Sequence, residues 1–181
     1  MFKKTLLCAA LVAVSGGALA KATGASTALI HSTEGAIDVA TIPVAAATMT
    51  LQASYVQGDI ITLTYSQPFT AATTHGALAI TDATNNIPLT VLTSDATSVT
   101  YRTGAVPGAY DYTLAQTLVI PTHNIIGSNQ ASGTLVTLGY AAATSTGQAI
   151  DAGTVDTVVA EFWDQYQVAV TVKADALIDV E

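Results

Sequence analysis

Hydrophobic and polar residues alternate along much of this chain with the period of two that is typical of β-strands. Over residues 48–55, Met, Leu, Ala and Tyr face one way, while Thr, Gln and Ser face the other. Over residues 61–65, Ile, Leu and Tyr alternate with Thr in the same manner. Because the turn-forming residues Gln57-Gly58-Asp59 separate the two runs, the pattern predicts a hairpin between them.

Further short runs of the same kind follow, separated by segments rich in Asp, Asn, Ser and Gly, which favour turns. They predict strands at Leu78 to Thr81, Pro88 to Thr93, Ser98 to Thr103, Gln116 to Ile120, Thr134 to Tyr140, Tyr166 to Val172 and Ala176 to Val180.

One segment fits two structures. Val155, Val158, Val159, Phe162 and Tyr166 would share one face of a helix, but β-branched residues also favour strands. We interpret it as a strand, since its neighbours are strands.

Short strands without intervening helices predict an all-β fold, and we expect an antiparallel β-sandwich of immunoglobulin-like character. The 28 threonines after residue 20 support this expectation, because β-branched side chains suit a half-buried pleated surface. The alternative all-β fold, a closed outer-membrane barrel, would need aromatic girdles. Only ten aromatic residues follow Phe2, and the chain ends in Asp179-Val180-Glu181, so the sandwich is favoured.

The first twenty residues resemble a secretory signal that is cleaved from the mature protein. Lys3 and Lys4 precede an apolar stretch over residues 6–14, and Ala18-Leu19-Ala20 supplies the small residues of a cleavage site. We therefore expect residues 21–181 to form a single all-β domain that is secreted to the cell surface or the medium rather than kept in the periplasm. Cys8, the chain's one cysteine, would be removed with the signal. No later apolar run is long enough to predict a transmembrane helix.

Charge excludes one class of partner. After residue 20, the three strong bases Lys21, Arg102 and Lys173 stand against 13 acidic residues, a net charge of −10 with histidine neutral. Nucleic-acid binding requires a basic surface, so we exclude it.

No catalytic motif is present: the chain lacks the Ser elbow of hydrolases, zinc-binding His pairs and phosphate-binding glycine loops. His31, His75 and His123 stand far apart in turn-like contexts, where solvated surface histidines are common. Glu161 and Asp164 flank Trp163 and could form an acid pair beside a sugar-stacking ring, but a packed tryptophan with solvated neighbours explains them as well. We predict a protein that is not an enzyme.

Acidic residues concentrate in the predicted turns, and calcium is the cation that carboxylates and loop carbonyls prefer. The candidate ligands are Asp151 and Asp156, which flank the predicted loop 152–155, together with Asp95 and Asp59. The alternative is an acidic, solvated surface with no bound ion. Asp175, Asp179 and Glu181 on the last predicted strand admit the same two interpretations.

Three segments show a family resemblance: Tyr55 to Thr64, Leu92 to Arg102 and Ser145 to Asp151. They are similar to strand-and-turn segments of secreted, acidic, Thr-rich β-proteins of marine Gram-negative bacteria. Some of these are surface-layer proteins, which assemble into a calcium-dependent lattice on the outer membrane. The resemblance covers most of residues 45–181. In such proteins further β-domains tend to follow, so the chain is either a short relative or a fragment of a longer multi-domain surface protein.

Two classes of function remain open. The resemblance implies a structural surface protein that packs against copies of itself or cell-surface polysaccharide. The alternative is an adhesin-like or carbohydrate-binding module that uses Tyr110, Tyr112 or Trp163 as stacking platforms. A row of exposed aromatic rings would favour sugar binding, and buried rings would favour assembly.

Overall fold

The computed structural model describes residues 22–33, 41–69, 75–126 and 130–164, except for the side chains of 152–155. Within these residues the chain forms a series of strands and no α-helix. The strands are β1 (Thr23–Ser26), β2 (Leu29–Ser32), β3 (Thr41–Val44), β4 (Ala47–Leu51), β5 (Ile60–Tyr65), β6 (Ala79–Thr81), β7 (Asn86–Ser94), β8 (Ser98–Thr103), β9 (Gln116–Ile120), β10 (His123–Ile126), β11 (Leu135–Ala143) and β12 (Ala149–Trp163).

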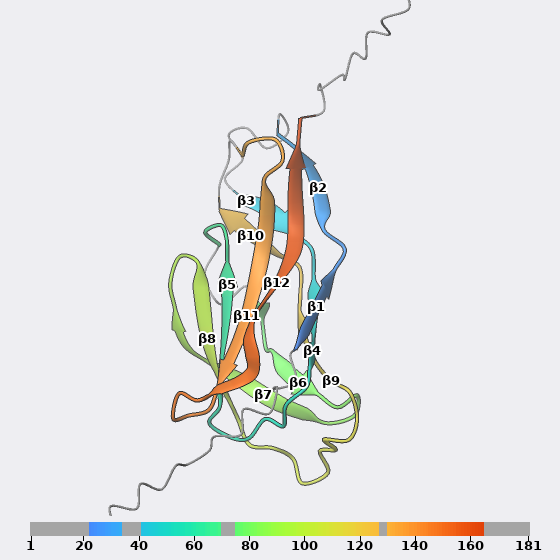
Figure 1. Ribbon diagram of the computed structural model, residues 1–181, viewed down its shortest axis with the longest axis vertical. Coiled ribbons are helices and arrows are strands. Elements are labelled where there is room, and N and C mark those ends of the chain that lie inside the picture. The colour runs from blue at the N-terminus through green and yellow to red at the C-terminus, as the bar shows by residue number, and fades with distance from the viewer. Residues whose placement is uncertain (1–21, 34–40, 70–74, 127–129, 165–181) are drawn as a thin grey trace, which may run out of the picture.

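Ten of these strands form one curled sheet, in the order β1-β4-β9-β6-β7-β8-β5-β11-β12-β2 (Figure 1). All neighbours are antiparallel except β12 and β2, which are parallel. The sheet has two halves, β1-β4-β9-β6 and β8-β5-β11-β12-β2. The long strand β7 joins them, because its first residues pair with β6 and its later ones with β8. The sheet therefore folds over on itself, and its concave side encloses the core.

The first strand draws the two halves together. β1 pairs with β4 in one half and also lies against β12 of the other. Gly24 makes this approach possible, since a Cβ atom at that position would stand 1.8 Å from Thr157 Oγ1. The hydrophobic cluster inside contains large, fully buried side chains from both halves: Met49, Tyr55, Leu63, Tyr65, Tyr101, Leu118, Tyr140 and Phe162.

A two-stranded sheet of β3 and β10 packs at one end of the curled sheet (Figure 1). Ile42, Val44 and Ile125 are buried in the common core, and Phe69 forms a bridge with Ile125. This small sheet closes the core at the end opposite the loops that join β4 to β5 and β11 to β12 (Figure 1).

Most of the strands predicted from alternation are present, and two of them, β8 and β9, have the predicted bounds. The ambiguous segment is the strand β12, as interpreted. The alternation in β5 is confirmed, because Ile61, Leu63 and Tyr65 are buried while Thr62 and Thr64 lie on the other face.

The predicted hairpin between residues 48–55 and 61–65 is wrong. β4 pairs with β1 and β9, whereas β5 pairs with β8 and β11 in the other half of the sheet. The chain crosses from one half to the other through residues 52–59, so this is a crossover connection and not a tight turn. Alternation predicts each strand, but it carries no information on which strands pair.

Four predictions fall outside the described residues: the signal segment 1–20, the strands at 166–172 and 176–180, and the acidic group of Asp175, Asp179 and Glu181. Among the residues described, none belongs to a helix that is long and apolar enough to cross a membrane.

Candidate functional site

The four predicted calcium ligands do not come together in the structure. Asp59 and Asp151 are buried at the end of the sheet that carries the loops between β4 and β5 and between β11 and β12. Asp95 caps the turn between β7 and β8, accepting hydrogen bonds from the backbone N–H groups of Thr97 (2.8 Å) and Ser98 (2.7 Å). That turn lies near Phe69 and the small sheet, since the Phe69 N–H donates to the Ala96 carbonyl.

The predicted loop at residues 152–155 is also wrong, because β12 runs through these residues. Asp151 and Asp156 therefore do not flank a loop: Asp151 points into the core and Asp156 is exposed on the outer face. Over the part of the chain that the structure describes, no three His, Cys, Asp or Glu side chains are close enough together to hold a metal ion.

Asp151 belongs to a buried network with two tyrosines. Its Oδ2 accepts a hydrogen bond from the Tyr55 hydroxyl, which also contacts the Tyr140 hydroxyl. Its Oδ1 accepts from the Gln52 N–H at 3.1 Å. Burial, the nearby Tyr140 and the bond to Asp151 all raise the pKa of Tyr55 far above its usual value. The two tyrosines are therefore neutral hydrogen-bonding groups that fix the 52–55 segment to β11 and β12.

At the same end of the sheet, Asp59 holds the end of the crossover to β8. Its carboxylate accepts from the Val56 N–H at 2.8 Å, and its carbonyl accepts from the Thr103 N–H at 2.9 Å. Its side chain is 2% exposed. Both aspartates thus have structural partners, which alternation alone did not predict because the partners are far away in sequence.

Two of the three histidines are buried together beneath the small sheet, contrary to the solvated setting expected for them. The two ring nitrogens of His75 bond the hydroxyls of Tyr65 and Tyr101, each at 2.8 Å. The rings of His75 and His123 lie 4.7 Å apart, edge to face. Burial and the neighbouring His123 lower the pKa of His75 to about 4, and burial lowers the pKa of His123. Both rings are therefore neutral near pH 7 and serve packing.

The aromatic residues proposed as sugar-stacking platforms do not form a row. Tyr110 is buried. Tyr112 donates a hydrogen bond to the Tyr55 carbonyl, which holds its ring against the loop end of the sheet. Trp163 is the last residue of β12, is 49% exposed and donates to Glu161 at 3.1 Å.

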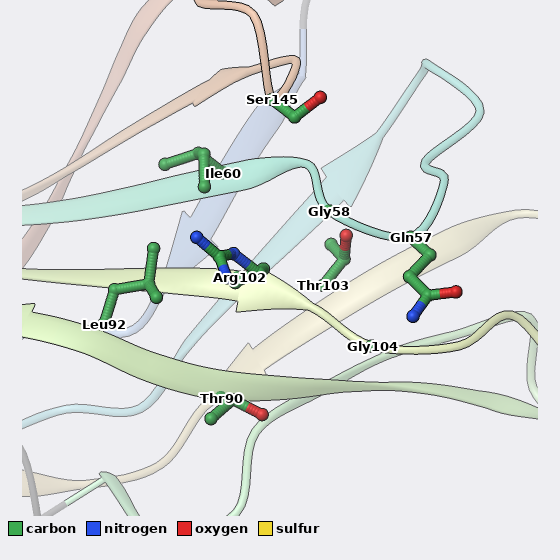
Figure 2. A pocket seen from close by; sticks show the side chains of 9 residues that line it. All are labelled: Gln57, Gly58, Ile60, Thr90, Leu92, Arg102, Thr103, Gly104 and Ser145. Carbon is green, nitrogen blue, oxygen red and sulfur yellow. The ribbon is translucent and has the colours of Figure 1, made fainter.

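A groove of about 420 Å³, lined by both polar and apolar residues, opens on the outer face of the sheet, beside the crossover between β4 and β5. Figure 2 shows Arg102 in it, between Ile60 and Leu92, with Gln57, Thr90 and Ser145 around the rim. Arg102 comes from β8, where it is paired with Ile60 of β5 and Thr90 of β7. The groove can therefore offer a guanidinium, an amide and hydroxyl groups to an anionic or polar partner.

The sequence did not single out Arg102 as a site residue. The signal that could have found it is its isolation, since it is one of only three strong bases after residue 20. Its place in the groove depends on the pairing of β5, β7 and β8, which the sequence pattern does not specify.

Comparisons with known proteins point to one family. The family described as S-layer protein Slr4 matches residues 38–181. Among curated proteins, none matches the chain significantly. Among solved structures, a DUF4466 family protein from Parabacteroides merdae aligns with a TM-score of 0.38 and 12% sequence identity, over 78% of this chain. The chain spans less than half of that protein, 44% of its length.

Proposed function

Because the chain belongs to the S-layer protein Slr4 family, we propose that it is a non-enzymatic structural protein, secreted after removal of residues 1–20, that packs against copies of itself on the cell surface. The observation that carries this proposal is the extent of the family match. It begins before β3 and runs through β12 to residue 181, so it includes most of the curled sheet.

The chemistry of the structure agrees with a packing role. The buried polar side chains of Asp59, Asp151 and His75 are used in hydrogen bonds that hold strands and loops together. The rings of Tyr110 and Tyr112 are in contact, with centroids 5.0 Å apart, but Tyr110 is buried and the Tyr112 hydroxyl is bonded to the Tyr55 carbonyl. Trp163 ends β12 at the other end of the sheet, so these rings do not form an exposed row for stacking a sugar. A saccharide-binding role thus has no specific support from the described residues.

We infer further that the curled sheet is a sandwich of immunoglobulin-like character. Two features support this: β7 passes from one half of the sheet to the other, and the adjacent strands β1 and β2 pair with opposite halves. Two antiparallel layers about 10 Å apart define such a fold. An experimental structure in which the two halves form a round barrel would contradict the inference.

Calcium stabilisation stays a prediction. If a site binds the ion, dissolved calcium at millimolar concentration should raise the melting temperature more than sodium chloride of equal ionic strength, because binding adds RT ln(1 + [L]/Kd) to the free energy of unfolding. Asp156→Asn is the informative variant, because Asp156 is exposed and its loss leaves the buried network of Asp151 intact. Equal effects of the two salts would show plain screening and no site.

The proposed function is tested with the secreted protein. Negative-stain electron microscopy and sedimentation of the purified mature chain should show regular arrays or oligomers that grow with concentration. A protein that stays monomeric at high concentration, with or without calcium, would contradict the proposal. Mass spectrometry of the same sample should give Lys21 as the first residue.

A further inference from the structure

Arg102 is the sole lysine or arginine within the described residues, which carry eight aspartates and glutamates. It is exposed, and its side chain has no ion pair or hydrogen bond with any other described residue. An acidic protein that packs against itself must bring like charges together, at a cost in free energy. Where Arg102 lies on such a surface therefore decides which contacts between copies are electrostatically favourable.

Asp156 lies on the same outer face as Arg102. On β8, Val99, Tyr101 and Thr103 are buried, so Arg102 faces outward. On β12, Asp156 is exposed and pairs with Gly139 of β11, which in turn pairs with Thr64 on the outer face of β5. The strand order β8-β5-β11-β12 puts three strand spacings between the two charged residues. That is about 14 Å across the strands, and the register adds about 13 Å along them, because Asp156 is in register with Ser98, four residues before Arg102. The resulting separation of about 19 Å is too far for an ion pair within one copy.

The described residues between them carry no charge. Strands β5, β8 and β11 present small outward residues there, of which Thr64 is exposed and the others half-buried: Thr62, Thr64, Ser98, Thr100 and Ala141. Figure 1 shows these strands side by side with β12. Among the described residues of β7, β8, β5 and β11, Arg102 is the sole charged one. Short side chains let another sheet approach closely and lose little conformational freedom on contact.

We propose that this face is a self-complementary interface between two copies, in which Arg102 of each copy binds the carboxylate of Asp156 of the other. The inference rests on the proposed function. In a two-fold contact, residue i meets residue j and j meets i, so one positive and one negative position on the same face form two ion pairs. A two-fold axis in the plane of the contact, midway between the two positions, satisfies this geometry.

The groove suits a carboxylate. The planar guanidinium of arginine can donate two parallel hydrogen bonds to one carboxylate, a geometry that lysine cannot match. Gln57, Thr90 and Ser145 provide further polar groups at the rim (Figure 2). Ile60 and Leu92 beside Arg102 add apolar surface that the contact would cover. Partial removal of this pair from water strengthens its Coulomb attraction, which offsets the cost of desolvating the two charged groups.

Charge-swap variants test the proposal by sedimentation velocity at low ionic strength. Arg102→Gln and Asp156→Asn should each weaken self-association at least tenfold, and Arg102→Asp should weaken it more, because it places two aspartates together. The double variant R102D/D156R should restore association to near the level of the unchanged protein. Gln148→Glu and Gln148→Lys, at an exposed turn position, make the same changes of net charge as Arg102→Gln and Asp156→Asn, and should leave association unaltered.

Each outcome decides a separate point. A protein that never self-associates overturns both the proposed function and this interface. Normal association in Arg102→Gln overturns the interface alone, and if that variant instead loses binding to cell-surface polysaccharide, the groove is a saccharide site. Weak single variants that the swap does not restore would show that Arg102 meets another partner. Circular dichroism and thermal melts check that each exposed substitution leaves the fold unchanged.

Discussion

At Asp151 the backbone has a φ of 51°, in the left-handed region that aspartate and asparagine tolerate better than most residues. The side chain is 1% exposed and accepts hydrogen bonds from Tyr55 and Gln52. Asp151→Asn keeps the backbone preference and one acceptor, so it should lower the free energy of unfolding by about 1 kcal/mol.

Asp151→Ala should cost about 3 kcal/mol, because it leaves buried donors unpaired and lacks the left-handed preference. Asp156→Asn is the matched exposed control and should change stability by less than about 0.5 kcal/mol. Urea unfolding measures all three variants. Equal losses at positions 151 and 156 would contradict the structural role given to Asp151.

The buried histidines predict how stability depends on pH. The pKa of His75 falls from 6.5 to about 4 on folding, and the pKa of His123 is lowered as well. The folded state therefore binds fewer protons than the unfolded chain between about pH 6.5 and 4, so the free energy of unfolding should decrease as the pH falls through this window. The slope is at most about 1.4 kcal/mol per pH unit for each histidine.

Urea titrations at several pH values measure this slope, and His123→Leu should reduce it, because the variant removes one buried titrating ring. Hydrogen bonds lower the pKa of Asp95 and Asp111. Those groups affect stability mainly below about pH 4, so they do not explain a loss at pH 5. Equal stability at pH 7 and pH 5 would show that the histidines are accessible to protons in the folded state.

At the scale of single strands, adjacent residues of β5 lie on opposite faces of the sheet, one toward the core and the next toward the outside. Leu63 is fully buried and contributes to the core, while Thr62 lies on the outer face beside Thr100. Leu63→Asp should cost several kcal/mol because it buries an unpaired charge, whereas Thr62→Asp should cost less than about 1 kcal/mol. Chemical unfolding of both variants as monomers provides the measurement. Similar losses would contradict the assigned faces of β5.

The contact of β1 with β12 depends on Gly24. A Cβ there would lie 1.8 Å from Thr157 Oγ1 and 3.2 Å from Thr157 Cβ, so Gly24→Ala should separate the strands and cost about 1–3 kcal/mol. Thr157→Ala removes a buried hydroxyl that has no partner among the described residues, and should be nearly neutral. The double variant should lose less stability than Gly24→Ala alone. A double-mutant cycle measured by thermal melts detects this coupling. Additive losses would mean that β1 does not pack as described.

Sequence alternation predicts strands with one buried face and fails for strands of other kinds. β8 and β9 have strict alternation and are predicted with their observed bounds. β1 and β2, with the sequences Thr-Gly-Ala-Ser and Leu-Ile-His-Ser, are short edge strands without alternation, and the sequence does not reveal them. The pairing of β4 and β5 with distant strands is set by packing across the core, which a local pattern does not encode.

For the candidate sites, too, the sequence predicts local features but not the contacts made through strand pairing. The sequence shows that acidic residues are many and bases few, but it places Asp59 and Asp151 in solvated turns, although both are buried. Their partners, such as Tyr55 and Tyr140, are brought to them by strand pairing and not by closeness in the chain. Arg102 is a rare base in the sequence, but only the sheet order places it on one face with Asp156.

At the scale of the whole molecule, the chain combines a net charge of −8 over its full length with a broad, nearly uncharged sheet face. A negative charge makes single copies repel one another in solution, and in the proposed interface the sheet face is the surface on which they meet. The chain belongs to the S-layer protein Slr4 family, which is consistent with a structural, surface-layer-like protein.

Electron cryotomography of the cell surface tests the central claim most directly. Cells that produce the protein should carry a regular surface array, and cells from which the gene is deleted should lose the array or show an altered lattice. Complementation with the unchanged gene should restore it. An array that is the same with and without the gene, or a protein found only inside the cell, would contradict the account.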